Sequence, residues 1–372
     1  MKNEIFTNIS KIIERDSKVT TYKFALLRGV IDIIQDNSPY ISIAGDRVHF
    51  PLGLLIEKWM IYYYPILESS IHIPQINVNR NLAFETRLKK IISAYSNNNG
   101  ISAFYNDMRN KGIPSHLQDD FLALAKKLGD TITQMPMRHI GYSVNNAEYS
   151  IFQWEKGHLQ RNPAKVDLEF LITNFGTFSI PLDYYQAFQV LGSFISGQDS
   201  ILFKWAEFSV NASDENLSIE KVVSNVLKSP ITERDVKASK NLYKSILEKD
   251  GKVYCVWTGK EITRYDVDHI IPFSIWKNND LWNLLPAQAA VNNQKRDKIP
   301  GVGQIEKNKD LILHYWELIH QFQSERFEKE IQVTLLGKHP FSGPNWQTTA
   351  IQQLQKSCDY LITNRGFQEW NI

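Results

Sequence analysis

The chain has 372 residues, of which 43% are hydrophobic and 22% are charged, a composition that excludes a disordered protein and allows two or three domains. No apolar run reaches the roughly 20 residues of a membrane-spanning helix, and the N-terminal stretch has no signal-peptide core, so we expect a cytoplasmic protein without a membrane partner. Its two cysteines, Cys255 and Cys358, are too few for a disulfide-stapled secreted domain or a four-cysteine zinc site.

The charges are unevenly distributed along the chain. The net charge is +2, but residues 221–300 contain 14 Lys or Arg against 9 Asp or Glu. A basic segment in a near-neutral protein indicates a polyanionic partner such as nucleic acid. A solvated, lysine-rich face explains the same excess equally well.

The fold class predicted for the first 220 residues is α+β, mainly helical with short β-hairpins, with a further boundary within residues 97–135. We expect this region to recognise a substrate or a partner. Apolar spacing and turn residues predict, in chain order, a helix at 22–34, a hairpin at 40–50, a helix at 52–64 opened by Pro51, and a helix at 79–95 capped by Asn79.

A similar succession follows further along the chain. A second hairpin is predicted at 168–180, and Pro181-Leu182 then leads into a helix at 183–194, as Pro51-Leu52 does earlier. After a helix at 198–208 we place a boundary near residue 220. Residues 221–306 are predicted to form a second module, and residues 307–372 to pack on it as helices at 308–327 and 345–362.

Between residues 253 and 300, polar residues occur within segments predicted to be strands, at positions where a hydrophobic core would have apolar residues. Asp268 and His269 lie side by side in a strand-like run, and Asn283 lies in a second short strand predicted over residues 282–286. The following helix carries Asn292 and Lys295, which share a face because they lie three residues apart.

This order and spacing resemble the HNH endonuclease family, in particular the HNH domain of RNA-guided CRISPR nucleases and stand-alone bacterial restriction or defence HNH proteins. The resemblance implies a ββα-metal module in which Asp268 and Asn292 hold one divalent cation, Mg²⁺ or Mn²⁺, and His269 activates water. It implies that Asn283 shapes the loop between the strands and orients His269. Lys295 is expected to contact a phosphate oxygen or to pair with Asp297.

The strand geometry adds a condition. Neighbouring side chains of a regular strand point to opposite faces, so Asp268 and His269 meet only if the strand bends or twists there.

Many HNH proteins also carry two Cys-x-x-Cys pairs that bind a structural zinc. Here only Cys255 of the first pair is present, and Gln288 and Val291 occupy the places of the second pair. We therefore expect no structural zinc, a buried Cys255, and stabilisation by the packing of three tryptophans, Trp257, Trp276 and Trp282.

The resemblance implies a metal-dependent DNA endonuclease that leaves 5′-phosphate and 3′-hydroxyl ends, in bacterial restriction or phage defence. One module cuts one strand at a time, so a double-strand break requires a homodimer or sequential nicking, and an activating or guiding partner is expected. Two alternatives stay open: an RNA-cleaving toxin or RNA-processing enzyme, and a non-catalytic nucleic-acid-binding effector that retains the HNH shell.

Overall fold

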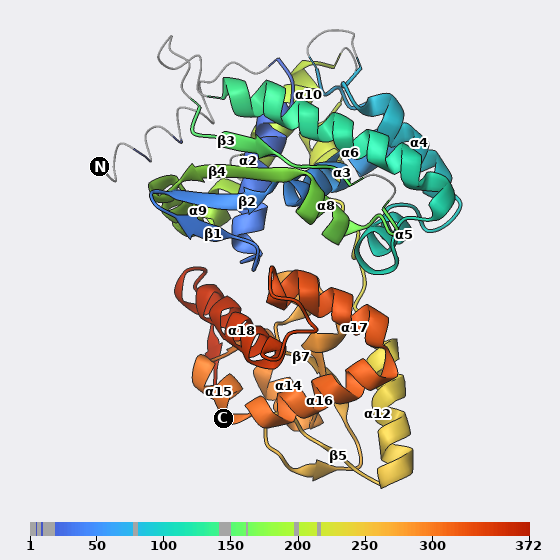
Figure 1. Cartoon of the computed structure of the whole chain (residues 1–372), viewed down its shortest axis with the longest axis vertical. Helices are drawn as coiled ribbons and strands as arrows, with labels where there is room; N and C mark the ends of the chain where they lie inside the picture. Colours follow the sequence, from blue (N-terminus) through green and yellow to red (C-terminus); the bar gives the residue numbers. More distant parts are fainter. Residues whose placement is uncertain are drawn as a thin grey trace. The chain divides into compact units, whose positions relative to one another are not determined.

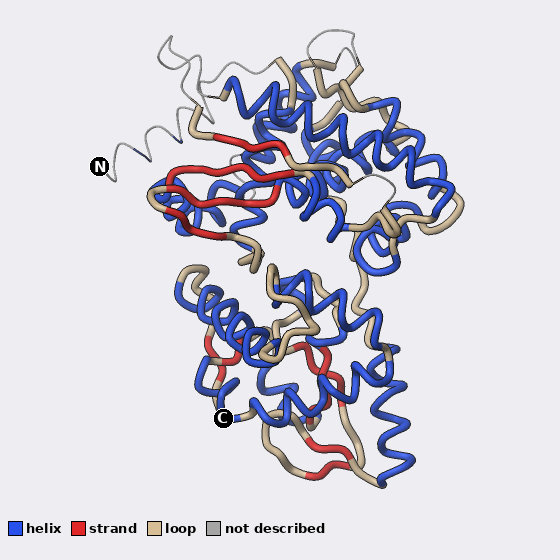
Figure 2. The backbone as a smooth tube through the Cα atoms, in the orientation of Figure 1, coloured by secondary structure: helices blue, strands red, loops and turns tan. Residues whose placement is uncertain are grey.

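The computed structural model describes residues 5, 9, 19–76, 81–140, 150–160, 163–196, 201–213 and 217–372. The chain divides into two compact units: one formed by residues 1–36 and 40–230, the other by residues 37–39 and 231–372. Both are mainly helical with short, mostly antiparallel strand pairs, so the predicted α+β class is confirmed (Figures 1 and 2). Within the described residues, no helix is long and apolar enough to cross a membrane.

The first unit surrounds a four-stranded antiparallel sheet of order β1-β2-β4-β3. Its strands are β1 (Ser42–Ala44), β2 (Arg47–Pro51), β3 (Gln153–Lys156) and β4 (Gly176–Pro181). Its helices are α2 (Tyr22–Gln35), α3 (Leu52–Glu68), α4 (Glu85–Tyr95), α5 (Gly100–Asn106), α6 (Gln118–Ile132), α8 (Leu168–Asn174), α9 (Leu182–Ser196), α10 (Ile201–Asn211) and α11 (Ile219–Val226).

The two Pro-Leu dipeptides occupy equivalent places in this sheet. β2 ends at Pro51 and β4 at Pro181, and each proline is followed at once by a helix, α3 or α9. The two strands pair antiparallel, so each proline lies at the end of the ladder opposite to the other. Next to this ladder α3 approaches α8 so closely that a Cβ on Gly53 would lie 2.2 Å from the Leu171 carbonyl oxygen, which explains the glycine.

Three sequence predictions in this chain are wrong in part. Residues 168–180 are not a hairpin: the Asp167 side chain accepts a hydrogen bond from the Phe170 N–H (3.0 Å) and caps helix α8, and only β4 remains a strand. The helix predicted from Asn79 begins at Glu85, while residues 77–80 lie outside the described residues. The helix predicted over 308–327 is two helices, because the non-helical backbone of Gln323 interrupts it.

The second unit contains the predicted ββα arrangement, formed by β7, β8 and α14. Its strands are β5 (Val253–Tyr254), β6 (Glu261–Ile262), β7 (Asp266–His269), β8 (Leu284–Ala287), β9 (Ile299–Pro300) and β10 (Glu369–Trp370). Its helices are α12 (Lys237–Asp250), α13 (Phe273–Trp276), α14 (Ala289–Lys295), α15 (Val302–Lys307), α16 (Lys309–Phe322), α17 (Ser324–Ile331) and α18 (Trp346–Thr363).

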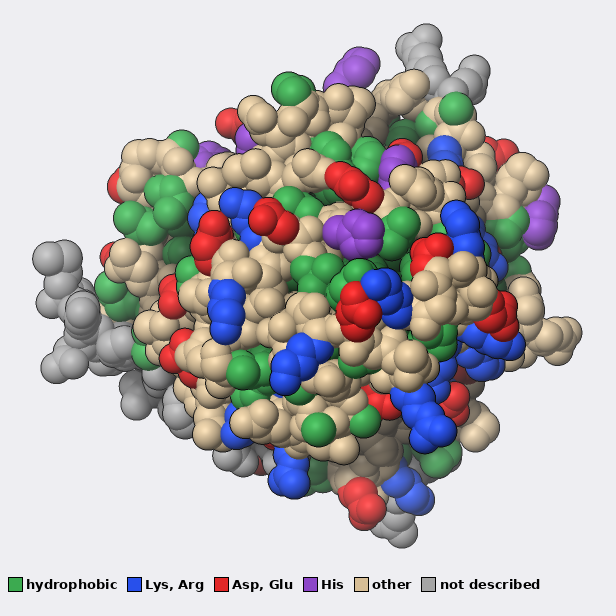
Figure 3. Space-filling view, turned by 90° about the horizontal axis from the view of Figure 1, so that it is seen from below, with side chains coloured by type: hydrophobic (Ala, Val, Ile, Leu, Met, Phe, Trp, Pro, Cys, Tyr) green, Lys and Arg blue, Asp and Glu red, His purple; other side chains and the backbone are tan. Residues whose placement is uncertain are grey.

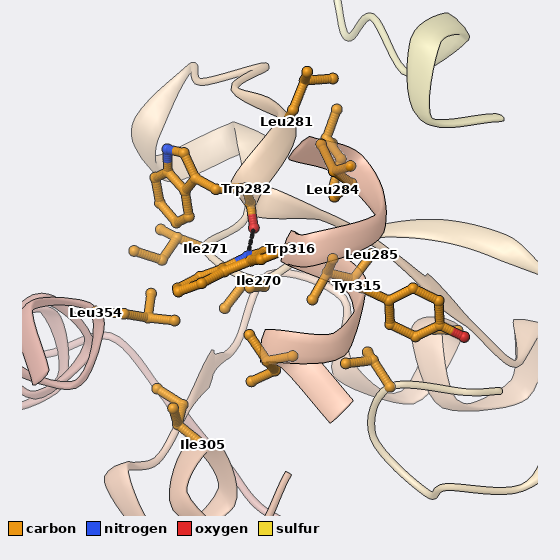
Figure 4. Close-up of a cluster of buried hydrophobic side chains, with 14 of the residues drawn as sticks. Ile270, Ile271, Leu281, Trp282, Leu284, Leu285, Ile305, Tyr315, Trp316 and Leu354 are labelled. Atoms are coloured by element: carbon orange, nitrogen blue, oxygen red, sulfur yellow. Dashed lines mark hydrogen bonds between the residues drawn. The ribbon is translucent and has the colours of Figure 1, made fainter. Parts of the chain in front are cut away.

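One hydrophobic core runs through this unit from α12 to β10. Figure 4 shows its centre, where Trp316 of α16 packs among Ile270, Leu285 and other apolar side chains and donates a hydrogen bond to the Trp282 carbonyl oxygen (2.8 Å). Side chains from the segments 221–306 and 307–372 both contribute to this core. The division of the chain at residue 306 stays a prediction.

Candidate active site

Strand β7 carries Asp268 and His269. It pairs with β8 without interruption, from Asp266 opposite Ala287 to His269 opposite Leu284. Because side chains alternate along a strand, Asp266 and Asp268 project to one face and His269 projects to the other. The pairing shows no interruption at this place, so the ordinary twist of the strand is what would have to bring Asp268 and His269 to one substrate group.

Asp268 is only 3% exposed, and both of its carboxylate oxygens are hydrogen-bonded. Lys295 Nζ lies 3.0 Å from Oδ1, and Trp257 Nε1 donates to Oδ2 at 2.7 Å. The fully buried Lys295 also donates to the His269 carbonyl oxygen. Lys295 therefore pairs with Asp268 rather than Asp297, and its ammonium joins the Asp268 side chain to the His269 backbone.

Asn292 contacts Asp266 on the same face of β7. Its Nδ2 donates to Asp266 Oδ2 (3.2 Å), and this contact fixes the orientation of the amide because a carboxylate can only accept. The Asn292 amide oxygen receives no hydrogen bond from the described residues. Asp266, Asp268 and Asn292 thus place three oxygen-bearing side chains on the face of β7 that α14 covers.

These donors are of the type that a hard divalent cation prefers. The chemistry of the predicted ligands Asp268 and Asn292, and of Asp266 beside them, fits such an ion, and their role as ligands stays a prediction. In this structure the cationic partner of Asp268 is Lys295. Among the described residues, no group of three or more His, Cys, Asp or Glu side chains is arranged to hold a metal.

The His269 imidazole faces a different set of groups. It is 3% exposed, and its Nε2 lies 3.5 Å from Oδ1 of Asn279. The Asn279 amide is fixed by two backbone groups: Nδ2 donates to the Glu233 carbonyl (2.9 Å), and Oδ1 accepts from the Asp235 N–H (3.1 Å). An amide oxygen only accepts, so Nε2 of His269 carries the proton and Nδ1 is left with the lone pair.

Electrostatics keep this imidazole neutral. Burial first, and then the positive charges of Arg234 and Lys295, together lower the pKa of His269 to about 3, although the hydrogen bond with Asn279 opposes them. A neutral imidazole is the protonation state that a general base needs.

The depressed pKa predicts a loss of stability in acid. The unfolded chain binds a proton at His269 near pH 6.5 and the folded chain near pH 3, so the stability that the neutral histidine provides above pH 6.5 is lost as the pH falls towards 3. Between pH 7.5 and pH 5 the contribution is about 2 kcal/mol. Urea unfolding at the two pH values should show this loss in wild type and in the exposed-site control His314→Gln, but a smaller loss in His269→Gln. Equal losses in all three would contradict the assignment.

Asn283 clamps the backbone that follows His269. Its buried amide donates to the Ile271 carbonyl (3.0 Å) and accepts from the Ile271 N–H (2.8 Å), while its own carbonyl accepts from the Ile270 N–H (2.8 Å). This contact lies two residues after His269. That Asn283 orients the imidazole stays a prediction.

The cysteine and two of the three tryptophans behave as expected. Cys255 is buried, and its sulfur accepts a hydrogen bond from the Gln288 N–H (3.3 Å). Trp257 and Trp282 are buried, and the half-buried Trp276 packs edge-on against Trp282 with ring centroids 6.4 Å apart. Trp257 has a further role that the sequence did not suggest, since its indole N–H binds Asp268.

Sequence reasoning missed Asp266, Asn279 and Arg234 as neighbours of the site. Asp266 had a usable signal, because two residues along a predicted strand return to the same face. Asn279 lies in the β7–β8 connection and Arg234 precedes α12, and no spacing rule connects either residue to His269.

Comparisons with known proteins agree with this geometry. Residues 2–226 match the model of a domain family of unknown function (DUF8808), and residues 255–301 match a model described as HNH endonuclease. The chain belongs to the DUF8808 family and carries an HNH endonuclease module. A stretch of 120 residues is 28% identical to the CRISPR-associated endonuclease Cas9 of Listeria innocua, covering 30% of this chain. The residues that match the HNH endonuclease model include β7, β8 and α14. The chain covers only 8% of the length of the Listeria innocua Cas9.

Proposed function

We propose that this protein is a metal-dependent DNA endonuclease in which His269 acts as the general base. The observation that carries the proposal is that one short strand, within the residues that match the HNH endonuclease model, bears both oxygen-bearing side chains and a neutral histidine, which the twist of the strand would bring to one phosphate. Asp266, Asp268 and Asn292 lie on one face of β7, and the neutral His269 is held on the other. The similarity to a CRISPR-associated endonuclease supports a role in bacterial restriction or phage defence.

The chain's own residues would act as follows. Nδ1 of His269 takes a proton from the attacking water, whose oxygen bonds to phosphorus as the bond to the 3′ oxygen breaks. The departing 3′ oxygen takes a proton from solvent water, which leaves a 5′-phosphate and a 3′-hydroxyl. A bound phosphate raises the pKa of His269, because nearby negative charge favours the imidazolium, and this makes the histidine a stronger base when substrate is present. A divalent cation held by Asp268 and Asn292 would supply Lewis-acid stabilisation of charge on the phosphate and the leaving oxygen.

Cleavage of supercoiled plasmid tests the proposal. With Mg²⁺ or Mn²⁺ the wild type is expected to nick the plasmid, and His269→Ala to do so at least about 100-fold more slowly, the usual contribution of a general base. His314→Ala, which removes an exposed histidine of the same unit, should retain wild-type activity. No DNA cleavage by a folded wild type, together with cleavage of an RNA of matched sequence, would overturn the DNA assignment in favour of a ribonuclease.

A further inference from the structure

Arg234 is anchored to the free edge of the catalytic strand. In the β7–β8 ladder Val267 lies opposite Pro286, whose carbonyl accepts from the Val256 N–H on the other side of β8. This is a non-hydrogen-bonded pair, so the Val267 carbonyl points away from β8 to the free edge of β7. Nη2 of Arg234 donates to this carbonyl. The guanidinium is therefore attached to the edge of β7, at the backbone of the residue that lies two positions before His269.

The backbone on either side of Arg234 is fixed as well. The Glu233 carbonyl and the Asp235 N–H bind the two ends of the Asn279 amide, whose oxygen faces His269. Residues 233–235 are thus all hydrogen-bonded to β7 or to Asn279, next to His269. The positive charge of Arg234 acts directly on the imidazole.

Most of the guanidinium remains available for another ligand. It has five N–H donors, and the contact with Val267 is its one hydrogen bond or ion pair with the described residues. Arg234 is exposed, unlike the buried Lys295. Over the face seen in Figure 3, Lys and Arg side chains are interspersed with Asp and Glu and do not form one continuous basic patch.

We propose that Arg234 binds a non-bridging oxygen of the scissile phosphate beside His269. The fork of a guanidinium matches phosphate geometry, and the anchoring of the segment 233–235 removes much of the freedom that an exposed arginine would lose on binding. The inference rests on the proposed nuclease function and adds a substrate-binding cation to it. The competing interpretation is that Arg234 only attaches the segment before α12 to β7.

Binding of DNA without metal gives the first test. A fluorescein-labelled DNA duplex is titrated in EDTA at several salt concentrations, and the slope of log affinity against log salt is measured. Each phosphate contact contributes about one to this slope, so Arg234→Ala should lower it by about one. Lys244→Ala removes an exposed lysine that pairs with Glu248 on α12 and should leave the slope unchanged. An unchanged slope in Arg234→Ala overturns the inference.

Cleavage gives the second test and separates the two proposals. Arg234→Ala should cut plasmid about 10- to 100-fold more slowly than wild type, as expected for loss of one charged donor to the reacting phosphate. Millimolar guanidinium should restore part of this activity in Arg234→Ala but none in His269→Ala. A purely anchoring role predicts a lowered thermal midpoint without rescue. Wild-type cleavage with a fully active Arg234→Ala refutes only this inference, whereas a wild type that neither binds nor cuts DNA refutes the proposed function as well.

Discussion

Replacing Lys295 by methionine is expected to lower the free energy of unfolding of the unit formed by residues 231–372 by about 3–5 kcal/mol. Lys295 is fully buried, and it neutralises Asp268, which is only 3% exposed. Methionine has nearly the same length and fills the same space. The variant therefore tests the contribution of the positive charge of Lys295 to stability. Without the ammonium, the buried negative charge of Asp268 has only the indole N–H of Trp257 as a partner.

Two comparisons make this result specific. Adding Asp268→Asn to Lys295→Met removes the unpaired charge and should recover most of the lost stability, because replacing both partners of a buried pair is far milder than removing one. Lys244→Met, at an exposed i,i+4 ion pair, should change stability by less than about 0.5 kcal/mol. Urea unfolding followed by hydrogen exchange in peptides of β7 and α14 reports on this unit alone. A single variant as stable as wild type would show that Asp268 is solvated.

The sequence motif predicts which residues form the site but not what they contact. Spacing alone places Asn292 and Lys295 on one helical face, and the structure has both facing β7. The partners could not be predicted in the same way. Trp257 binds Asp268, and Arg234 and Asn279 face His269, from segments that are brought together only by tertiary packing.

The secondary structure was predictable where apolar residues follow a clear helical spacing, and it was not predictable where residues that favour a strand lie in a segment that forms a helix. Helices α2 and α3 have long apolar faces at helical spacing, and both lie where the sequence predicts them. Residues 168–174 contain β-branched and aromatic side chains that favour a strand. The cap from Asp167 and the close contact of Gly53 with the Leu171 backbone stabilise the short helix α8 instead, and neither contact can be recognised from spacing.

Replacing Trp316 by alanine is the second change with a large expected effect. Trp316 lies on α16, outside the residues that match the HNH model, yet it is fully buried at the centre of the core of this unit (Figure 4). Removing a buried tryptophan costs about 3–5 kcal/mol through lost burial and the remaining cavity. Because Trp316 also donates to the Trp282 carbonyl, the residue before Asn283, nuclease activity should fall together with stability.

The conservative variant Trp316→Phe separates packing from hydrogen bonding. It keeps an aromatic ring but leaves the buried Trp282 carbonyl without its donor, so we expect a loss of about 1–3 kcal/mol. Hydrogen exchange in peptides of β8 and α14 should follow the order wild type, Trp316→Phe, Trp316→Ala. Such an order would mean that the matched residues 255–301 depend for their shape on the helices that follow them. Unchanged protection of β8 in Trp316→Ala would instead mean that the ββα arrangement is stable without α16.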